Sequence, residues 1–260
     1  MARTTTPKAI KYKRNFLDRV VIRFDFDNIE LGKLKNFSER IQDKFPYQEQ
    51  KDGRSGAMKI DLKRGQIVDN KLQPTTIWEF LGPSKQKKIT VTSTYIAVEY
   101  LSRSYSDRNE LLKDCDDIVL PFLEQFSVST INRLGLRYVN NFDLNSIKKD
   151  FDWKDYFKPE LLSGIQFAKK RKTKMMRSLN QLELKYERED LRFVFGVFNP
   201  DYPNENTRRE FVMDTDCYSR FPLEPKNDVH EAIERYNVHV QEIFENSITD
   251  SLRDILQKKV

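Results

Sequence analysis

Two aspartates in the last predicted strand are the residues best suited to acid chemistry. Asp214 and Asp216 are two positions apart in the alternating segment Phe211–Phe221, so their side chains lie on one face, about 6–7 Å apart. With Glu183 they could form the acid pair of a hydrolase or a cradle for a cation. Arginines and lysines on neighbouring strands could equally pair with them, as is common on solvated sheet faces. We favour the ion pairs.

The histidines and cysteines lack the surroundings that metal binding or thiol chemistry requires. His230 and His239 fall on one predicted helix but about 180° out of phase. His239 shares a helix face with Glu242 alone, whereas a metal site needs three or four ligands. Cys115 lies in an apolar helical stripe, and the residues flanking Cys217 carry no positive charge. Phosphate-loop, nucleophile-elbow and zinc motifs are absent, so we expect no cofactor, no metal and no enzymatic activity.

The segment R-L-G-L-R-Y-V-N-N, which begins at Arg133, carries the most distinctive pattern of the sequence. Alternation places Arg133, Arg137 and Asn141 on one face of a predicted strand. Gly135 indicates a bulge or the close approach of another segment. Asn140 and Asn141 could end the strand by bonding to the backbone. The candidate binding residues are therefore Arg133, Arg137, Asn140 and Asn141.

The guanidinium of Arg137 has two possible uses. Its planar fork can hold a carboxylate through two hydrogen bonds, and that carboxylate could belong to a ligand. It could equally belong to Glu183 or Asp214 of the same protein. We favour the internal pair, which would fix the strand at the junction between two halves of the protein.

The same segment resembles a known family. Its G-L-R-Y-V-N motif, the opening strand Phe16–Phe26, the strand Tyr95–Leu101 and the closing helix are similar to a sporadically distributed, uncharacterised family of prokaryotic proteins of about this length. Members of that family share a strand with the pattern G-L-R-Y-[VI]-N near the middle of the sequence. The resemblance implies a cytoplasmic protein with no established activity. It also implies patchy inheritance, as in mobile or defence-type gene cassettes, phage defence included.

Positive charge is concentrated in two loops. The protein carries 46 Lys and Arg against 40 Asp and Glu, a modest net charge of +6. Clustered cations suit phosphate binding, because counterion release grows with the number of phosphates neutralised. Lysine-rich loops also serve solubility, so nucleic-acid binding is the alternative function and not the first. The residues that would carry it lie in a predicted hairpin turn and between a helix and a strand: Lys85, Lys87, Lys88, Lys169, Lys170, Arg171, Lys172, Lys174 and Arg177.

Composition sets outer limits on the class of protein. The 260 residues are 38% hydrophobic and 33% charged, with only 8 Gly, which excludes collagen-like and low-complexity proteins and leaves enough apolar material for a core. No apolar run approaches the roughly 20 residues of a membrane span. The basic leader, residues 1–15, lacks the apolar core of a secretion signal. Two cysteines fit a reducing compartment, so we expect a cytoplasmic location and no membrane contact.

The first half of the sequence combines apolar alternation with helical spacing. We expect a loop at 47–57 and a hairpin turn after Leu81, where Gly82 and Pro83 precede the lysines. The predicted strands are Val20–Phe26, Met58–Lys63, Thr75–Leu81 and a long Lys88–Leu101, and the predicted helices are Gly32–Phe45 and Asp107–Phe126 with Asp107 as N-cap.

The second half repeats this order of elements. The predicted strands are Thr130–Leu144, Leu179–Glu187, Leu191–Asn199 and Phe211–Phe221, and the predicted helices are Trp153–Leu162, an amphipathic helix that includes Val229 and Phe244, and Thr249–Lys258. Strands joined by short turns imply antiparallel pairing. We therefore predict an α+β fold with duplicated β-α-β-β-β-α halves, 16–128 and 129–260, in one compact unit. A pseudo-twofold axis would relate the halves, and helices would back one face of a curved antiparallel sheet.

The uncovered face of that sheet would carry charges of both signs. The TATA-binding protein has a similar order of elements, but its saddle uses apolar wedges and a cationic rim, which a mixed-charge face does not supply. Our first functional hypothesis is a non-enzymatic binding or regulatory protein that recognises a protein partner or a second copy of itself. Nucleic-acid binding through the basic loops is the alternative, and a hydrolase built on Asp214, Asp216 and Glu183 ranks third.

Overall fold

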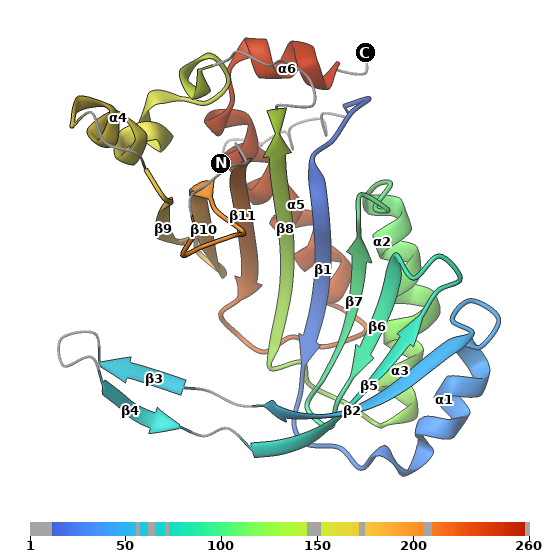
Figure 1. The fold of residues 1–260 in the computed structure, drawn as a ribbon. Coiled ribbons are helices and arrows are strands. Elements are labelled where there is room, and N and C mark those ends of the chain that lie inside the picture. The colour runs from blue at the N-terminus through green and yellow to red at the C-terminus, as the bar shows by residue number, and fades with distance from the viewer. Residues whose placement is uncertain are drawn as a thin grey trace.

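A long antiparallel sheet forms the framework of the protein. The computed structural model describes residues 12–55, 58–61, 66–70, 73–144, 152–171, 175–204 and 210–257. Its strands are β1 (Leu17–Asp25), β2 (Tyr47–Ser55), β3 (Met58–Asp61), β4 (Gln66–Asn70), β5 (Gln73–Leu81), β6 (Lys87–Val91), β7 (Tyr95–Leu101), β8 (Arg133–Asp143), β9 (Ser178–Lys185), β10 (Glu189–Phe198) and β11 (Glu210–Ser219). Nine of them form one sheet in the order β2-β5-β6-β7-β1-β8-β11-β10-β9 (Figure 1). The fold is therefore α+β, with antiparallel pairing as predicted.

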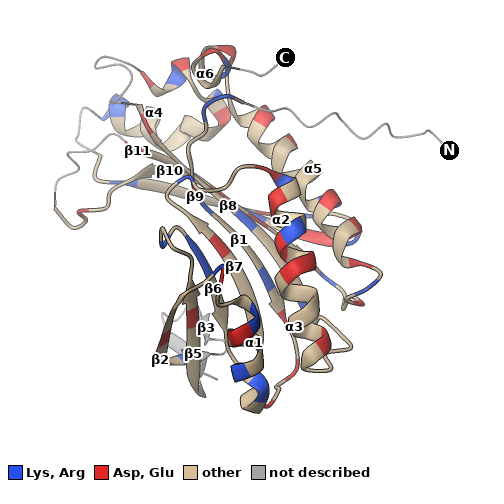
Figure 2. Ribbon diagram, turned by 90° about the vertical axis from the view of Figure 1, so that its right-hand side faces the viewer, with Lys and Arg blue, Asp and Glu red and all other residues tan. Residues whose placement is uncertain are grey.

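Helices cover one face of this sheet. They are α1 (Leu34–Ile41), α2 (Arg108–Asp114), α3 (Leu120–Gln125), α4 (Ser163–Lys170), α5 (Val229–Ser247) and α6 (Asp250–Leu256), and a π-helical turn, Cys115–Val119, joins α2 to α3. In Figure 2 the helices α2, α3 and α5 lie to the right of the strands, on one side of the sheet. Asp107 caps α2 as predicted, because its carboxylate accepts hydrogen bonds from the backbone N–H groups of Asn109 and Glu110. In the described residues no helix is both long enough and apolar enough to span a membrane.

The core fills the layer between sheet and helices. In β1, Ile22 and Phe24 are fully buried and alternate with the half-buried Arg23. On the helix side, Phe37 of α1 and Phe122 of α3 meet edge-to-face with ring centroids 5.0 Å apart. Each such side chain contributes about 1.5–3 kcal/mol when removed from water. The opposite face of the sheet keeps its polar residues, and this open face is where the candidate site lies.

The first half departs from the predicted order of elements. The segment 47–57 was predicted as a loop, but its residues 47–55 form β2, a polar edge strand held by β5. The predicted strand Lys88–Leu101 is two strands, because the Thr92 hydroxyl accepts hydrogen bonds from the backbone N–H groups of Thr94 and Tyr95 and closes a turn. The strand β4 and the helix α4 were not predicted.

The strand β3 also has a different place from the one predicted. It pairs with β4 in a separate two-stranded sheet, and this hairpin leads away from the main sheet (Figure 1). The second half keeps the predicted order, with β8, helical turns and α4, then β9, β10, β11 and α5. The strands β1 and β8, one from each half, pair directly in the middle of the sheet.

Candidate functional site

The open face of the sheet is organised by charge, strand by strand. Alternation turns charged residues of these strands away from the helices, and β1, β8 and β11 each present more than one. One such residue from each strand, taken from β5 to β9 along the sheet, gives the series Glu79, Lys88, Glu99, Arg23, Arg137, Asp216, Arg192 and Glu183. Signs therefore alternate between neighbouring strands except at the centre, where β1 and β8 both present arginines. The centre of the open face is therefore positively charged, whereas its flanks carry charges of alternating sign.

Asp214 and Asp216, the candidate acid pair, are both held by arginines of the open face. Arg137 donates to Asp214 from Nε to Oδ1 at 2.7 Å and from Nη2 to Oδ2 at 2.6 Å. Arg133 donates to Asp216 at 3.1 Å, and Arg192 lies 3.6 Å from the same carboxylate. Burial raises the pKa of Asp216, and the three guanidiniums oppose this in part. Of the two internal partners predicted for Arg137, Glu183 and Asp214, the structure shows Asp214.

Arg23 is fixed by its own strand and by β7. Its guanidinium donates to the Asp25 carboxylate two residues along β1 and lies over the Tyr95 ring, 3.8 Å from the centroid. Arg133 approaches the same aspartate at 3.6 Å. Asp25 is thus shared between two arginines, which keeps both guanidiniums in place at the centre of the face.

Gly135 gives Arg133 its position. A Cβ added at residue 135 would lie 2.6 Å from Nη1 of Arg133 and 3.0 Å from its Cζ, so the guanidinium lies directly over the glycine. The sequence predicted a bulge or a close approach at Gly135, and the structure shows the second, made by the side group of a residue two positions earlier. The pairing of β8 with β1 runs through Gly135 without a register shift, and the pairing with β11 ends there.

A shallow hollow of about 570 Å³ lies over β7, β1 and β8. Small side chains form its floor, because Ala97 and Gly135 are the direct neighbours of Arg23 on the two sides. Charged and aromatic groups form its rim, among them Glu99 and Tyr95. Its positive residues, here called the arginine stripe, are Arg19, Arg23, Arg133 and Arg137.

Arg19 and the floor of the hollow were missed by the sequence analysis. The predicted strand began at Val20, whereas β1 begins three residues earlier, at Leu17. Extending the alternation of Arg23 back to residue 19 would have placed both arginines on one face. Arg19 is exposed and has no hydrogen bond or ion pair to the described part of the protein, so its guanidinium is available to a ligand.

The flank on the β7 side is a series of ion pairs. Lys88 lies between Glu79 at 2.9 Å and Glu99 at 3.2 Å, and Lys51 of β2 reaches Glu79 at 2.5 Å. Burial lowers the pKa of Lys88, but the two carboxylates outweigh burial and leave the pKa raised. This flank is a structural network of opposite charges that supports the sheet across four strands.

The two asparagines of the β8 motif lie on opposite faces. Asn141 faces the open side and donates to Glu210 at 2.9 Å, so it bonds to a side chain and not to the backbone. Asn140 is buried on the helix side. Of the four candidate binding residues, Arg133, Arg137 and Asn141 share the open face and Asn140 is separated from them.

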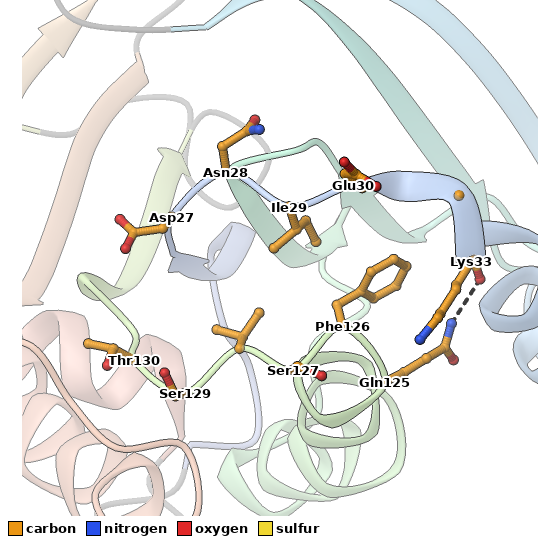
Figure 3. Close-up of a pocket in the computed structure, with 12 residues that line it drawn as sticks. Asp27, Asn28, Ile29, Glu30, Lys33, Gln125, Phe126, Ser127, Ser129 and Thr130 are labelled. Carbon is orange, nitrogen blue, oxygen red and sulfur yellow. Dashed lines mark hydrogen bonds between the residues drawn. The ribbon is translucent and has the colours of Figure 1, made fainter.

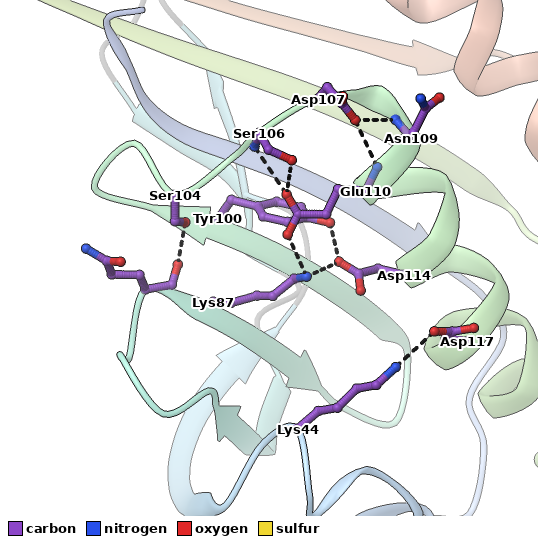
Figure 4. A network of polar contacts seen from close by, with 11 residues as sticks. Lys44, Lys87, Tyr100, Ser104, Ser106, Asp107, Asn109, Glu110, Asp114 and Asp117 are labelled. Carbon is purple, nitrogen blue, oxygen red and sulfur yellow. Dashed lines mark hydrogen bonds and ion pairs between the residues drawn. The ribbon is translucent and has the colours of Figure 1, made fainter.

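The predicted hairpin lysines are engaged within the protein. Lys87 forms ion pairs with Asp114 and, at 3.0 Å, with Glu110 of α2, and Tyr100 donates to the same Asp114 (Figure 4). Burial and the Asp114 carboxylate hold the pKa of Tyr100 far above its usual value. Lys88 lies in the flank described above, and Lys85 faces the Tyr47 ring at 5.4 Å. The hairpin therefore does not offer a free patch of three cations.

The second basic run is divided between elements. Lys169 and Lys170 lie in α4, and Lys169 pairs with Asp152 at 2.7 Å. Arg171 and Arg177 lie over the aromatic rings of Phe167 and Tyr202. Lys172 and Lys174 lie outside the described residues.

The histidines and cysteines occupy structural positions. His230 contacts Asp116 at 2.7 Å on the helix surface, and His239 stacks on Tyr186 with ring centroids 3.8 Å apart. Cys115 and Cys217 are buried free thiols, and burial raises the pKa of both. Among the described residues no group of three or more His, Cys, Asp or Glu is arranged to hold a metal ion.

A second depression, of about 510 Å³, lies where β1 and α3 end. Figure 3 shows that Gln125 reaches the Lys33 carbonyl, a hydrogen bond of 2.8 Å, while Ile29 and Phe126 face each other between the two loops. Its lining has no cluster of like charges comparable with the arginine stripe. We therefore place the candidate site in the central hollow.

Comparison with known proteins gives no information about the site, so its function must be inferred from its geometry. A scan against protein-family models and a search of curated proteins both found no match to this sequence. The resemblance to a sporadically distributed prokaryotic family, and the mobile or defence-type cassette that it implies, stay predictions.

Proposed function

We propose that this molecule is a binding protein whose arginine stripe takes an acidic segment of a partner protein. The observation that carries the proposal is the central hollow, where the two positive strands of the open face lie side by side. Guanidinium groups bind carboxylates through paired hydrogen bonds, and the small residues on the floor leave room for a bound side chain. The proposal keeps a protein partner as the first hypothesis and adds the chemistry of its recognition.

Preorganisation supports this role. Arg23 and Arg133 share Asp25, and Arg137 is held by Asp214. Side chains fixed in this way lose little conformational freedom when a ligand binds, so more of the interaction energy appears as affinity. Arg19 at the edge of the hollow adds a guanidinium with no internal acid to satisfy it among the described residues.

The flanks of the hollow favour a peptide over a nucleic acid. A nucleic-acid strand brings a phosphate charge at every nucleotide, and these charges would meet Glu99 on one side and Asp214 and Asp216 on the other. A peptide can place a few carboxylates over the stripe and neutral or basic side chains over the flanks. Among the described residues of the basic loops, Lys87, Lys88 and Lys169 are held in ion pairs, which adds to this preference.

The charge order also supports a duplicated architecture. Outward from the β1–β8 pair, each half presents an arginine, then an acid, then a base and then an acid. We infer that the two halves are related by a pseudo-twofold axis through this pair and that the stripe lies on it. Two buried free thiols support a reducing compartment such as the cytoplasm.

Fluorescence anisotropy with a labelled octaglutamate peptide tests the proposal. At low salt we expect saturable binding to the wild-type protein, and weakening by about tenfold or more in the double variant Arg19→Gln/Arg23→Gln, since loss of a charge-assisted pair costs about 1.4 kcal/mol or more. The matched control Lys35→Gln/Lys226→Gln removes equal charge from the helix side, where both lysines are highly exposed, and should bind like the wild type.

Three results would contradict this function. The first is no binding of octaglutamate to the wild-type protein. The second is equally weak binding to both double variants, which would reduce the effect to net charge. The third is binding of single- or double-stranded DNA that is tighter than binding of octaglutamate. If that DNA binding also fell steeply between low and high salt, and was lost in Lys169→Ala/Lys170→Ala/Arg171→Ala, it would establish the nucleic-acid alternative instead.

A further inference from the structure

The strand β9 leaves one edge of the main sheet open. In the described structure it pairs with β10 alone. The backbone N–H of Tyr186 donates to the Glu189 carbonyl at 2.8 Å where the hairpin closes, so even-numbered residues of β9 bond to β10. Because hydrogen-bonding direction alternates along a strand, the backbone groups of Leu179, Gln181, Glu183 and Lys185 point outward from the sheet.

Exposed apolar side chains mark this edge. Leu179 and Leu182 of β9 are 45% and 47% exposed. Phe198 and Tyr202 are also exposed, and they extend the apolar surface beyond the start of β9, where Val197 pairs with Ser178. Protein edges exposed to solvent usually carry charges that prevent pairing. An open edge with two exposed leucines is the pattern of a strand that pairs with another molecule.

The opposite edge of the sheet is protected by contrast. The strand β2 has the sequence Y-Q-E-Q-K-D-G-R-S, and its Lys51 is held by Glu49 and Glu79. Charges of both signs and a glycine discourage a further strand there. The two edges thus differ: β9 combines open backbone groups with two exposed leucines, whereas β2 exposes a single tyrosine, Tyr47, among polar and charged residues.

We propose that β9 pairs antiparallel with β9 of a second copy of this protein, with Leu182 on the twofold axis. A twofold axis perpendicular to the sheet keeps the open faces of both copies on one side, so the arginine stripe stays accessible. In this register Gln181 faces Glu183 of the second copy, and Leu179 faces Lys185. Leu182 faces its own counterpart in a non-hydrogen-bonded pair, where side chains approach most closely.

The pattern of β9 fits a second copy in this register. Its charged residues are Glu183 and Lys185. Centring the pair on Leu182 sets no like charges opposite each other, whereas centring it on Glu183 would face two carboxylates. The amide of Gln181 already donates to the Glu183 carboxylate at 2.8 Å within one strand, so these two groups can bond across the axis. Each strand is complementary to itself in this arrangement.

Sedimentation equilibrium at micromolar concentrations tests the pairing. We expect the wild-type protein to be a dimer and Leu182→Lys to be a monomer with an unchanged circular dichroism spectrum, because two lysines would meet on the axis. Tyr47→Lys provides the matched control, since Tyr47 is equally exposed but lies on the β2 edge, and this variant should stay dimeric.

Oxidative cross-linking tests the register without relying on a destabilising change. Leu182→Cys should form an intermolecular disulfide, since non-hydrogen-bonded pairs bring Cα atoms to about 4.5 Å. Gln181→Cys should not, because residue 181 faces residue 183 of the second copy. The two natural cysteines are buried. A monomeric wild type, a dimeric Leu182→Lys or equal cross-linking of both cysteine variants would overturn the proposal.

Discussion

Arg137 pairs with Asp214, its diagonal neighbour across the β8–β11 pair, although Asp216 lies directly opposite it. Asp216 is taken instead by Arg133 and Arg192. The hydrogen bonds to Asp214 raise the pKa of Arg137 further, against burial. Each aspartate is thus matched to a different arginine, and the network holds the β8 side of the hollow rigid.

Removing the Arg137 guanidinium should destabilise the protein. In Arg137→Met the largely buried Asp214 carboxylate loses its two charge-assisted hydrogen bonds. We expect a loss of about 1–2 kcal/mol in the free energy of unfolding, at the low end for a broken ion pair because the arginine is partly exposed. Urea unfolding followed by circular dichroism measures it. Arg137→Met/Asp214→Leu should recover most of the loss, and a double variant as unstable as the single one would contradict this account.

Lys87 should behave as a structural residue. Its ammonium neutralises the buried Asp114, which also accepts from Tyr100 (Figure 4). Lys87→Met leaves that carboxylate without its cation, and we expect a loss of about 2–4 kcal/mol in unfolding free energy. Lys85→Met on the same hairpin changes an exposed residue and should stay within about 0.5 kcal/mol of the wild type. Equal effects of the two substitutions in urea unfolding would refute the structural assignment.

Strong alternation of apolar and polar residues made the central strands predictable, whereas the structure of segments without that pattern was predicted wrongly. In β1 the buried Ile22 and Phe24 alternate with Arg23, and this pattern fixes both the element and its buried face. The strand β2 has no apolar alternation, because an edge strand is held by backbone pairing with β5, and it was predicted as a loop. The turn at Thr92 was hidden because β-branched residues favour strands.

The sequence predicted part of the candidate site but not its contacts. Alternation placed Arg133 and Arg137 on one face, and charge made Asp214 a reasonable partner. Local sequence could not show that Arg133 would lie over Gly135, or that Ala97 would border Arg23 from β7. Those relationships depend on register between strands far apart in the sequence, which tertiary packing decides.

Acidification should destabilise the protein through His239. Burial lowers the pKa of His239, Arg235 adds to this, and Glu189 and Glu242 oppose it. The unfolded protein therefore takes up a proton at a higher pH than the folded protein does, so stability falls as pH drops below the unfolded value of about 6.5. The Nδ1 atom of His239 is buried without a hydrogen-bond partner among the described residues, so protonation there gains no partner.

Replacing His239 by phenylalanine tests this, because the phenyl ring is uncharged and similar in shape to imidazole. His239→Phe keeps the stack on Tyr186 and removes the titration. Between pH 7.5 and 5.5 the urea midpoint should fall in the wild type and fall less in His239→Phe. Parallel pH profiles for the two proteins would show that His239 does not contribute.

Gly196 should be the least replaceable of the described glycines. Its φ of +139° is one that other residues rarely adopt, and an added Cβ would overlap the Ser178 carbonyl oxygen at the start of β9. Gly196→Ala must therefore strain β10 or displace the backbone of its neighbour, and we expect a loss of about 2–4 kcal/mol in unfolding free energy. Gly32 has no atom within 4 Å of an added Cβ, so Gly32→Ala should change stability by less than about 0.5 kcal/mol. Urea unfolding compares the two variants. If Gly196→Ala lost as little stability as Gly32→Ala, the backbone of β9 at its first residue would be able to move without destabilising the protein, which would contradict this prediction.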